Sequence, residues 1–575
     1  MRLRAWLLDR GLLLALGVLA LYAWLAPAHV VDGDNAEFAT LGALGGAAHP
    51  PGYPLYVLWL RALAWLPGES PAHTAALATA LLGAASIAIL HAACRAWGAR
   101  PLAATLACAL FAGAPIVMTM YSEAEVFALN GVIVGALLWL AAERGPVRGV
   151  RRALALGLVA GLGLANHHTC VLVAPVGILG LVRAVRESRW SALPIAAAGL
   201  AVGLVPYAYL LVAPSHPGSW GQVDGLGDVV AMFLRRDYGG PSTFATAGDA
   251  VPAAASLAAL ADTVGRTWLW LPALVGLASA VQRGVRRADG KEPRAGWWAL
   301  LASLALAGPV LVMQFNIAPE GVGRYVVDRF HLLPALLLAI PVADAIDRLA
   351  PVAARSLPRA PAALGHALAL GVLAAVAGTA LPHVARVHAP AVEEQARGVL
   401  RALPADAIVF GFDDDLALGI DYVQLALGER RDVAYAHVPM FGRGWYRARA
   451  ASRGLQIGDR YIDRALATGR PVFVQPFARD VVAAFPHYRV GILVRLLPRG
   501  TAVPPLDDVI AANKAWLASL ELDYDRPGPD DEWPTAIHRR YARTWRELAA
   551  ELAAAGRRDD AEWASEVARE IGPRP

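Results

Sequence analysis

The sequence has few charged residues and almost no cysteine. Of its 575 residues, 17% are charged and 57% are hydrophobic even before glycine is counted, whereas soluble domains are roughly 25% charged. A wholly soluble enzyme is therefore disfavoured. The three cysteines, Cys94, Cys108 and Cys170, all lie in or beside apolar segments, where a free cysteine behaves as a small hydrophobe. This pattern excludes a disulfide framework and a zinc site.

Acidic residues are nearly absent from the centres of the apolar runs, where they would be costly and would indicate an ion or proton path. The net charge is +5 and the isoelectric point is about 9.2, but nearly all the basic residues are arginines in short tracts between apolar runs. That placement is typical of membrane topology rather than of a nucleic-acid surface. We therefore expect a lipid bilayer as a partner and no nucleic acid.

Apolar runs of transmembrane length, about 20 residues, recur along the first two thirds of the chain. Eleven runs fit this template, at residues 11–28, 72–94, 101–119, 126–142, 153–166, 169–182, 191–213, 265–282, 297–315, 332–349 and 362–381. The fifth and sixth are short and flank Asn166, His167, His168 and Thr169. They form either a tight hairpin of two helices or one re-entrant feature.

The segments between these runs alternate between many arginines and few. If the N-terminus is cytoplasmic, the outer segments hold little beyond Arg235, Arg236, Arg324 and Arg329, and the inner segments hold almost all the rest. This positive-inside bias predicts a multi-pass membrane protein with a cytoplasmic N-terminus. The first run also resembles a signal peptide ending near Ala26-Pro27-Ala28, although we favour an uncleaved anchor, and either alternative places His29 outside.

An odd number of spans places the C-terminus outside the cytoplasm. We therefore expect a transmembrane domain at 1–382, an exported α/β domain at 383–503 and a helical segment at 504–575. Short β-like runs at residues 407–412, 432–438, 471–475 and 490–497 alternate with helical stretches in the second of these. Residues 541–571 resemble one antiparallel helix pair of tetratricopeptide type, which is too few for a repeat array.

The first outer loop contains paired acids. If a helix begins near Asp34, then Asp34 and Glu37 share a face at i, i+3 and present two carboxylates just above the bilayer. An alternative is purely structural, with Asp34 as the N-cap and Glu37 at N3 of a capping box. The stretch His49-Pro50-Pro51-Gly52-Tyr53-Pro54 that follows is typical of a rigid turn.

Other polar groups also gather in outer loops: Glu123 and Glu125, Asn166 to Thr169, Trp220-Gly221, Arg235 to Gly239, and Arg324 to Arg329. Two adjacent histidines cannot both face one metal from a regular helix, and no carboxylate lies at ligand spacing beside them, so we expect no metal site. The arginines are suited to phosphate oxygens, because a guanidinium fork is planar and always charged. Ordinary contact with lipid headgroups explains them equally well.

In this order the motifs resemble a known family. Residues 33–37 (GDNAE), 49–54 (HPPGYP), 123–130 (EAEVFALN), 166–169 (NHHT), 220–221 (WG) and 236–239 (RDYG) are similar to those of a large bacterial membrane family related to the eukaryotic endoplasmic-reticulum protein O-mannosyltransferase. The similarity spans roughly residues 29–445. It implies a mainly α, GT-C-like membrane fold, a catalytic carboxylate in the first outer loop and a polyprenyl-phosphate sugar as donor. One departure is that Asn35-Ala36 stand where the family usually has Ser-Gly.

The resemblance and the residue pattern together predict a mechanism. Asp34 would accept the proton of an acceptor hydroxyl, on a protein or a glycan, and Glu37 would orient it. Outer-loop arginines would stabilise the departing phosphate, and a single displacement would invert the sugar. No cofactor is implied, because the lipid-linked sugar is a substrate, and a divalent metal stays open. The expected substrate-binding residues are His49, Tyr53, Glu123, Glu125, Asn166, His167, His168, Trp220, Arg236, Tyr238, Arg324 and Arg329.

Two rival functions belong to other classes. A transporter or flippase would place ionisable residues near mid-membrane and would have paired repeats with broken helices, and neither is evident, although Pro115, Pro175 and Pro206 offer breaks. An exported scaffold that recruits partners through its C-terminal helices leaves the acids of the first loop unexplained.

Overall fold

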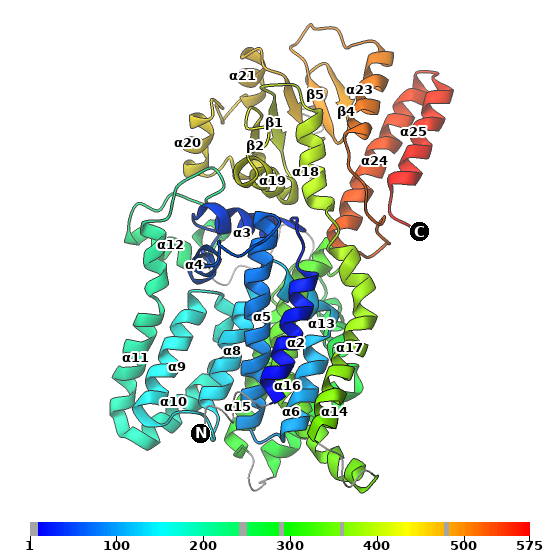
Figure 1. The fold of residues 1–575 in the computed structure, drawn as a ribbon. Coiled ribbons are helices and arrows are strands. Elements are labelled where there is room, and N and C mark those ends of the chain that lie inside the picture. Colours follow the sequence, from blue (N-terminus) through cyan, green and yellow to red (C-terminus); the bar gives the residue numbers. More distant parts are fainter. Residues whose placement is uncertain (1–9, 241–249, 287–291, 357–361, 477–481) are drawn as a thin grey trace.

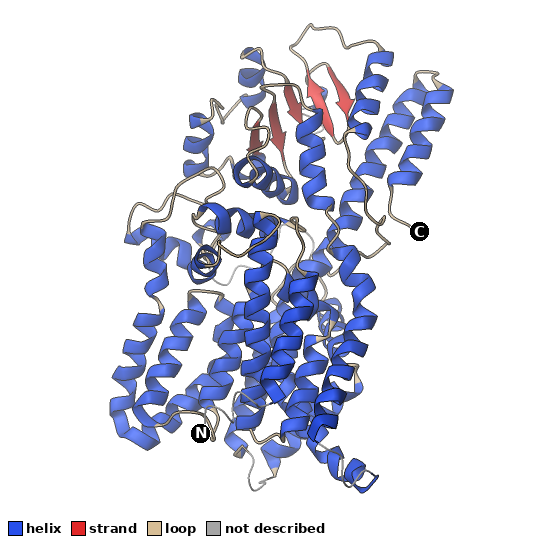
Figure 2. Ribbon diagram, viewed as in Figure 1, coloured by secondary structure: helices blue, strands red, loops and turns tan. Residues whose placement is uncertain are grey.

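The computed structural model describes the chain except for residues 1–9, 241–249, 287–291, 357–361 and 477–481. A bundle of long helices forms the lower part of the molecule, and a sheet with flanking helices lies on one end of it (Figure 1). All the described strands lie in this upper part, and the bundle is entirely helical (Figure 2). The predicted class, a mainly α polytopic membrane protein, is confirmed.

The first helices of the bundle include one or two at each of the first four apolar runs and two more between the first and second runs. Helix α5, for example, begins at Pro71 after Ser70, whose hydroxyl accepts a hydrogen bond from the amide of His73 at 3.0 Å. These helices are α2 (Arg10–Leu25), α3 (Gly33–Leu44), α4 (Pro54–Ala62), α5 (Pro71–Ala96), α6 (Pro101–Ala112), α7 (Pro115–Ser122) and α8 (Phe127–Ala141).

The remaining bundle elements contain more breaks. They are α9 (Gly149–Leu164), η1 (His168–Val173), α10 (Ala174–Ser188), η2 (Arg189–Ser191), α11 (Ala192–Gly203), η3 (Val205–Leu211), α12 (Leu226–Phe233), η4 (Arg236–Tyr238), α13 (Ala253–Trp268), α14 (Leu271–Val285), α15 (Arg294–Ala305), η5 (Leu306–Val310), α16 (Val322–Ser356) and α17 (Ala362–Val387). Helix α17 thus passes the domain boundary expected after residue 382.

The count of eleven spans is not confirmed. Within the described residues four helices are long and apolar enough to cross a membrane, or up to six if each of two bent pairs counts as one span. Helices α6 and α7 meet at 74°, and α13 and α14 at 101°, where Leu269 and Trp270 adopt positive φ angles. The runs at 101–119 and 265–282 are therefore bent or broken. The run at 153–182 forms two separate helices, α9 and η1–α10, so the hairpin alternative is the one observed.

The basic segments between helices gather at one end of the bundle. Glu187 of α10 pairs with Arg148 at 3.2 Å and with Arg152 at 2.9 Å, and Arg183 pairs with Glu143 at 3.1 Å. These ion pairs join the loop before α9 to the end of α10. Helices α3 and α4 lie at the opposite end of the bundle, beneath the sheet (Figure 1). The bundle therefore has one arginine-rich end and one end that faces the sheet.

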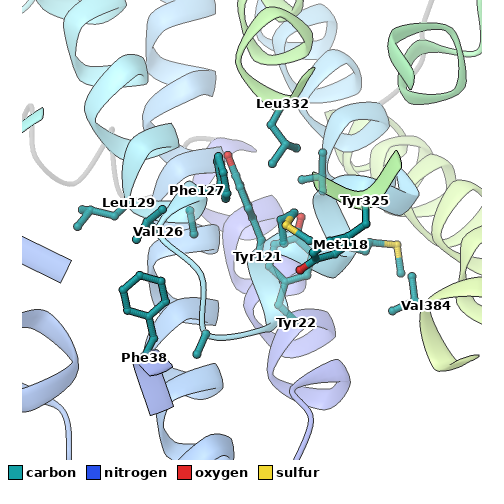
Figure 3. Packing of buried hydrophobic residues seen from close by; sticks show 14 of the residues in the cluster. Tyr22, Phe38, Met118, Tyr121, Val126, Phe127, Leu129, Tyr325, Leu332 and Val384 are labelled. Atoms are coloured by element: carbon teal, nitrogen blue, oxygen red, sulfur yellow. The ribbon is translucent and has the colours of Figure 1, made fainter. Parts of the chain in front are cut away.

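Buried aromatic and aliphatic side chains fill the bundle below α3. The rings of Tyr22 and Tyr121 meet edge to face with centroids 6.2 Å apart, and the Tyr22 hydroxyl donates to the carbonyl of Ala112 at 2.8 Å. Figure 3 shows Tyr325 of α16 and Met118 of α7 in the same cluster. This core fixes α7, the loop after it and α16 against one another, and the polar groups described below project from these elements.

The sheet has the order β2-β1-β3-β5-β4, with β1 parallel to both β2 and β3. Strand β3 pairs antiparallel with β5, and β4 and β5 form a hairpin whose turn places Gly491 at φ 56°. The run expected at 490–497 therefore corresponds to β5 and the turn before it, and β4 was not expected. The elements are α18 (Ala391–Ala402), β1 (Ile408–Gly411), α19 (Asp414–Asp421), η6 (Tyr422–Ala426), β2 (Ala434–His437), η7 (Val438–Met440), α20 (Gly444–Ser452), α21 (Tyr461–Ala467), β3 (Val472–Val474), β4 (His487–Val490) and β5 (Leu493–Leu496).

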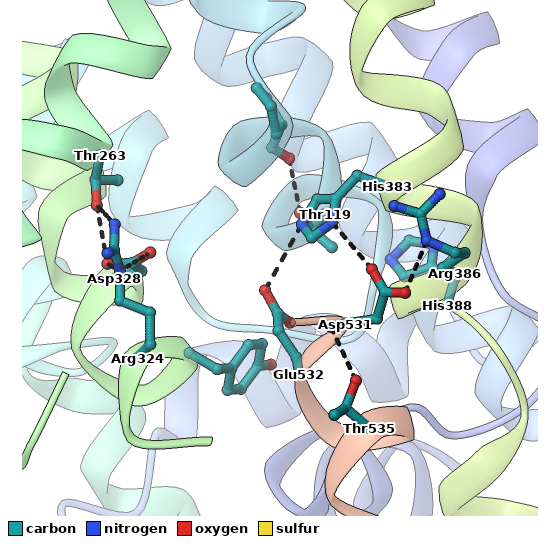
Figure 4. A network of polar contacts seen from close by, with 12 residues as sticks. Thr119, Thr263, Arg324, Asp328, His383, Arg386, His388, Asp531, Glu532 and Thr535 are labelled. Carbon is teal, nitrogen blue, oxygen red and sulfur yellow. Dashed lines mark hydrogen bonds and ion pairs between the residues drawn. The ribbon is translucent and has the colours of Figure 1, made fainter. Parts of the chain in front are cut away.

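Three helices end the chain: α23 (Leu506–Ala518), α24 (Glu532–Ala554) and α25 (Arg558–Ile571). Helices α24 and α25 form the expected antiparallel pair, packed on Trp516, Tyr541 and Trp545. The first turn of α24 reaches the bundle, where Asp531 pairs with Arg386 at 2.7 Å and with His383 at 3.5 Å (Figure 4). The C-terminal helices are thus anchored next to the sheet-facing end of the bundle.

Candidate active site

Helix α3 is capped by Asp32. The Asp32 carboxylate accepts a hydrogen bond from the amide of Asn35 at 2.7 Å, and the Asn35 side chain accepts one from the amide of Val31 at 3.1 Å. The structural alternative, a cap at Asp34 with Glu37 at N3, is therefore wrong, because the extended backbone ends at Asp32 and Asp34 is already the second residue of the helix. Asn35, where the sequence departs from the family pattern, completes the cap.

Asp34 and Glu37 instead line a cavity of about 600 Å³ between the bundle and the sheet. Its floor is α3 and the turn at His49, and α16 forms one wall. The loop at 217–220 closes another side, where the amide of Trp220 donates to the carbonyl of Ala47 at 2.7 Å. Both acids therefore face a space large enough for substrate.

Asp34 faces a buried arginine. Arg329 of α16 donates from Nη1 to Asp34 Oδ2 at 2.7 Å and to Glu125 Oε1 at 3.0 Å. Burial opposes ionisation of Asp34, but the charge of Arg329, assisted by His49, lowers its pKa below the ordinary value. Burial raises the pKa of Glu125 well above its ordinary value, against the opposing effect of Arg329. Asp34 is therefore the carboxylate that carries negative charge at neutral pH.

Glu37 is held by His49. One carboxylate oxygen of Glu37 lies 2.5 Å from His49 Nδ1, and the other accepts the His49 amide at 2.9 Å. Burial opposes protonation of His49, but Glu37 and Asp34 outweigh it and raise its pKa to about 9. The turn predicted at 49–54 is present, since the amide of Gly52 donates to the carbonyl of His49 at 2.8 Å. Glu37 therefore has a fixed orientation and a cationic partner.

Two further acids, Asp32 and Glu123, lie beside Asp34 and Glu37, and of these Asp32 lines the cavity. The hydroxyl of Tyr325 donates to Asp32, and it also lies 3.4 Å from Glu123. Both acids are almost fully buried. Burial, together with the neighbouring charge of Asp34, raises the pKa of Asp32, and burial and Asp32 raise that of Glu123 well above its ordinary value. Glu123 thus supports the floor from behind and does not line the cavity.

A second, mostly apolar cavity of about 360 Å³ lies beside the first, and Tyr53, His167 and His168 line it. The ring of Tyr53 stacks on His167 with centroids 5.9 Å apart and meets His49 at 5.0 Å, so Tyr53 lies between the two cavities. The described residues contain no group of three or more His, Cys, Asp or Glu arranged to hold a metal ion. The histidine pair therefore contributes to a largely apolar wall.

Of the other residues predicted to bind substrate, some line the first cavity and some line neither cavity. Trp220 and Tyr238 line the first cavity. Asn166 is buried and donates to the carbonyl of Val126 at 3.2 Å, which is a structural role. Arg236 is exposed and lines neither cavity, and Arg324 lines neither because it is paired with Asp328 and Asp262, both at 2.7 Å.

Sequence reasoning missed the roof of the cavity, which comes from the C-terminal third of the chain. Asp414, Asp421, His437, Trp445, Arg443, Arg449 and Arg453 line it from α19, from the end of β2 and from α20 with its flanking residues, and Trp533 of α24 joins them beside Tyr325. Asp32 was missed too, although the sequence offers it as a capping residue one position before Gly33. No local motif marks the roof residues, because only the tertiary fold places them over the first outer loop.

Comparison with known proteins gives consistent results. Residues 34–191 match the family described as the Protein O-mannosyl-transferase TMEM260 N-terminal domain. The Protein O-mannosyl-transferase TMEM260 of Mus musculus is 26% identical over 484 residues, which cover 79% of this chain and 67% of the mouse protein. The Dictyostelium discoideum protein of the same name is 25% identical over 235 residues, 36% of this chain and 28% of that protein. The chain is similar to the protein O-mannosyltransferases of this family, so the resemblance predicted from its motifs is confirmed, and the similarity supports a membrane glycosyltransferase.

Among solved structures, apo ArnT from Cupriavidus metallidurans superposes with a TM-score of 0.49 at 15% identity, covering 88% of this chain and all of that one. The match to the O-mannosyltransferase family begins at Asp34 and includes Glu37, His49 and Glu125. Arg329 and the whole roof lie outside it. The family model thus covers part of the floor of the cavity, and the longer match to the mouse protein, over 79% of this chain, extends across Arg329, Tyr435 and His437.

Proposed function

We propose that this chain transfers a hexosyl group, mannose or another hexose, from a polyprenyl-phosphate donor to an acceptor hydroxyl at the outer face of the membrane. The observation that carries the proposal is the ion pair between Asp34 and Arg329 on the floor of the cavity. It places a base and a fixed positive charge side by side, and glycosyl transfer from a phosphate requires both. The names of the sequence relatives support the choice of sugar.

Asp34 is the general base. It is ionised at neutral pH because Arg329 lowers its pKa, and its side chain stays 32% exposed on the cavity side. It accepts the proton of the acceptor hydroxyl while the oxygen attacks the anomeric carbon. A single displacement inverts that carbon. Glu37, held by His49, orients the acceptor beside Asp34.

Arg329 stabilises the leaving phosphate. Negative charge grows on the phosphate as the glycosidic bond breaks, and a buried guanidinium stabilises it without first having to reorganise. Within the described part of the chain, Arg329 Nε is buried and has no hydrogen-bond partner. Arg324 is not assigned this role, because Asp262 and Asp328 already engage it.

The apolar cavity next to the floor suits the donor's lipid. Val171 and Leu172 line it from η1, and Leu311 and Phe330 line it from the other side. A polyprenyl chain in this cavity would reach the floor past Tyr53. His167 and His168 would then contact the isoprenoid near the phosphate, which agrees with their predicted part in binding.

The proposed orientation of the protein in the membrane rests on the difference between the two ends of the bundle. The arginine-rich end would lie in the cytoplasm under the positive-inside rule, and the cavity would open on the outer face. The α/β part at 383–503 and the helices at 504–575 would then be exported. Nucleotide sugars are cytoplasmic, which is why a lipid-linked donor is proposed.

The direct test is the product formed by the purified protein in detergent or liposomes. It would receive defined polyprenyl-phosphate hexoses together with peptide and glycan acceptors, and products would be identified by mass spectrometry. Transfer with inversion from one lipid-linked hexose is expected. No transfer and no donor hydrolysis with any of these donors, while nucleotide sugars react, would overturn the proposal.

A further inference from the structure

The first turn of α24 meets the bundle beside the first cavity. Trp533 of this turn lines the cavity, although α24 belongs to the helical segment at the C-terminal end of the chain. The ring of Trp533 meets that of Tyr325 edge to face, with centroids 6.3 Å apart and an interplanar angle of 74°. The segment at 504–575 therefore contributes a side chain to a cavity whose floor lies in the first outer loop.

Contacts on both sides hold this turn in place. Asp531 forms an ion pair with Arg386 of α17 at 2.7 Å (Figure 4), and its amide donates to the hydroxyl of Thr535 at 2.9 Å. Glu532 adopts a left-handed φ of 51°, a conformation that persists in a residue other than glycine only where its surroundings impose it. Trp533 therefore reaches the cavity from a fixed turn.

Tyr325 connects Trp533 with the floor of the cavity. The Tyr325 hydroxyl donates to Asp32, and the guanidinium carbon of Arg329 lies over the Tyr325 ring, 5.1 Å from its centroid. Asp32 caps α3, the helix that carries Asp34, and Arg329 is the ion-pair partner of Asp34. One phenol side chain thus contacts both groups that set the position of Asp34, and Trp533 packs on its ring.

We infer that Trp533 is a positioning residue of the transfer site, which holds the Tyr325 ring and through it keeps Arg329 directed at Asp34 and at the donor phosphate. The inference rests on the proposed function, because Arg329 has to be held in this way only if it acts on the donor. An active-site group displaced by about 1 Å can cost about 10²-fold in rate. The C-terminal helices are then part of the catalytic unit, since one of them supplies the ring that fixes Tyr325.

Substitutions of Trp533 and of a second tryptophan in the same helix pair test this role. Trp533→Ala removes the ring that packs on Tyr325, whereas Trp533→Phe keeps an aromatic ring there. Trp533→Leu retains apolar volume without an aromatic edge and replaces Trp533→Ala if that variant does not fold. Trp563→Ala is the matched control, because Trp563 of α25 packs on Trp545 with centroids 5.2 Å apart and does not line the cavity.

Trp533→Ala should lower kcat by about tenfold to 10²-fold and move the acid limb of the profile of kcat/KM against pH to higher pH. The shift is expected because Arg329 lowers the pKa of Asp34, and a displaced Arg329 lowers it less, so that Asp34 takes up a proton at a higher pH. Trp533→Phe should keep most of the wild-type rate, and Trp563→Ala should leave both the rate and the acid limb unchanged. A merely structural Trp533 would lower the melting temperature without moving the acid limb.

Binding of polyprenyl phosphate to the full-length protein in detergent, measured by calorimetry, gives a readout that needs no transfer. Trp533→Ala should raise the dissociation constant about threefold to tenfold, because the contact of Arg329 with the phosphate is weakened. An unmoved acid limb with unchanged phosphate binding, an effect confined to KM for the acceptor, or an equal effect of Trp563→Ala would overturn the inference.

The two readouts separate this inference from the proposed function. A wild-type protein that transfers no hexose but binds polyprenyl phosphate, with weaker binding in Trp533→Ala, rejects the proposed function alone. Hexose transfer with the same kinetics and acid limb in Trp533→Ala as in the wild type rejects the positioning role alone. A wild-type protein that neither binds polyprenyl phosphate nor transfers hexose rejects both.

Discussion

The substitution Asp34→Asn tests the catalytic role of Asp34 without disturbing the start of helix α3, because Asp32 is the residue that caps this helix. The amide is nearly isosteric with the carboxylate, still accepts a hydrogen bond from Arg329, and cannot act as a base near neutral pH. Position 34 is the second residue of α3 and makes no capping contact. The variant is therefore expected to fold, insert and bind donor as the wild type does.

Two magnitudes follow from the geometry. An exposed ion pair contributes about 0.2–1 kcal/mol; Arg329 is only 12% exposed, so this is a lower bound for the cost of replacing the Asp34 carboxylate, and the amide that still accepts from Arg329 limits the loss. Arg329 also keeps its contact with Glu125 at 3.0 Å. Loss of general-base assistance costs about 10²–10⁴ in rate. Activity should thus fall by orders of magnitude while the melting temperature changes little.

Asp32→Ala provides the opposite control. It removes the acceptor for the amide of Asn35, and loss of a helix N-cap costs about 0.5–2 kcal/mol. It also removes the partner of the Tyr325 hydroxyl. The assay measures initial rates of transfer from a polyprenyl-phosphate hexose beside thermal unfolding in the same detergent. Asp32→Ala should lower the melting temperature clearly more than Asp34→Asn does.

The reasoning fails if Asp34→Asn transfers sugar at a rate close to that of the wild type. It also fails if the variant unfolds as readily as Asp32→Ala, because its inactivity would then reflect a damaged helix. A protein that is stable, binds donor and is inactive is the only outcome consistent with Asp34 as the base.

Three further predictions concern the rest of the site and the topology. Arg329→Lys should lower the transfer rate by about tenfold to 10³-fold, because a directed donor to the phosphate is lost. Arg324 lies outside both cavities, so Arg324→Lys should keep wild-type kinetics. Equal effects of the two substitutions in rate assays would remove Arg329 from the site. The folded pKa of His49 is raised from 6.5 to about 9, so its ion pair with Glu37 stabilises the fold fully below about pH 6.5 and loses this contribution as the pH rises through about 9. The melting temperature should therefore fall more between pH 6 and pH 10 in the wild type than in His49→Gln. Parallel curves of melting temperature against pH for the two proteins would contradict the assignment. A reporter fused after Pro575 should be active outside the cytoplasm, and a cytoplasmic signal would move the cavity to the wrong face.

The helical bundle and the acids of the floor were predictable because each has a local signal. Apolar runs located most helices, since burial in lipid requires a continuous stretch of apolar side chains. The acids of the first outer loop stood out for the same reason, because charge is rare elsewhere in the bundle sequence. The bends at Gly113 and at Leu269 were not predictable, because continuous hydrophobicity does not indicate whether the helix axis is straight.

The assignment of roles within the floor depended on tertiary contacts. Asp32 and Asp34 flank one glycine, and either can cap a helix. The choice is made by α16, about 290 residues later in the chain, where Tyr325 donates to Asp32 and Arg329 pairs with Asp34. For the same reason the sequence could not separate Arg329 from Arg324, five residues before it. Arg329 lines the cavity, whereas Arg324 forms ion pairs with Asp262 and Asp328.

The division of the cavity into floor and roof has a mechanistic consequence. In the proposed function the floor carries the general base, Asp34, and the phosphate-binding Arg329 on helices of the bundle, where the geometry of proton transfer and charge stabilisation must be maintained. The roof lies on a different structural layer, formed by α19, β2 and α20. If the roof holds the acceptor, substitutions there should alter KM for the acceptor, whereas substitutions of Asp34 and Arg329 should alter kcat.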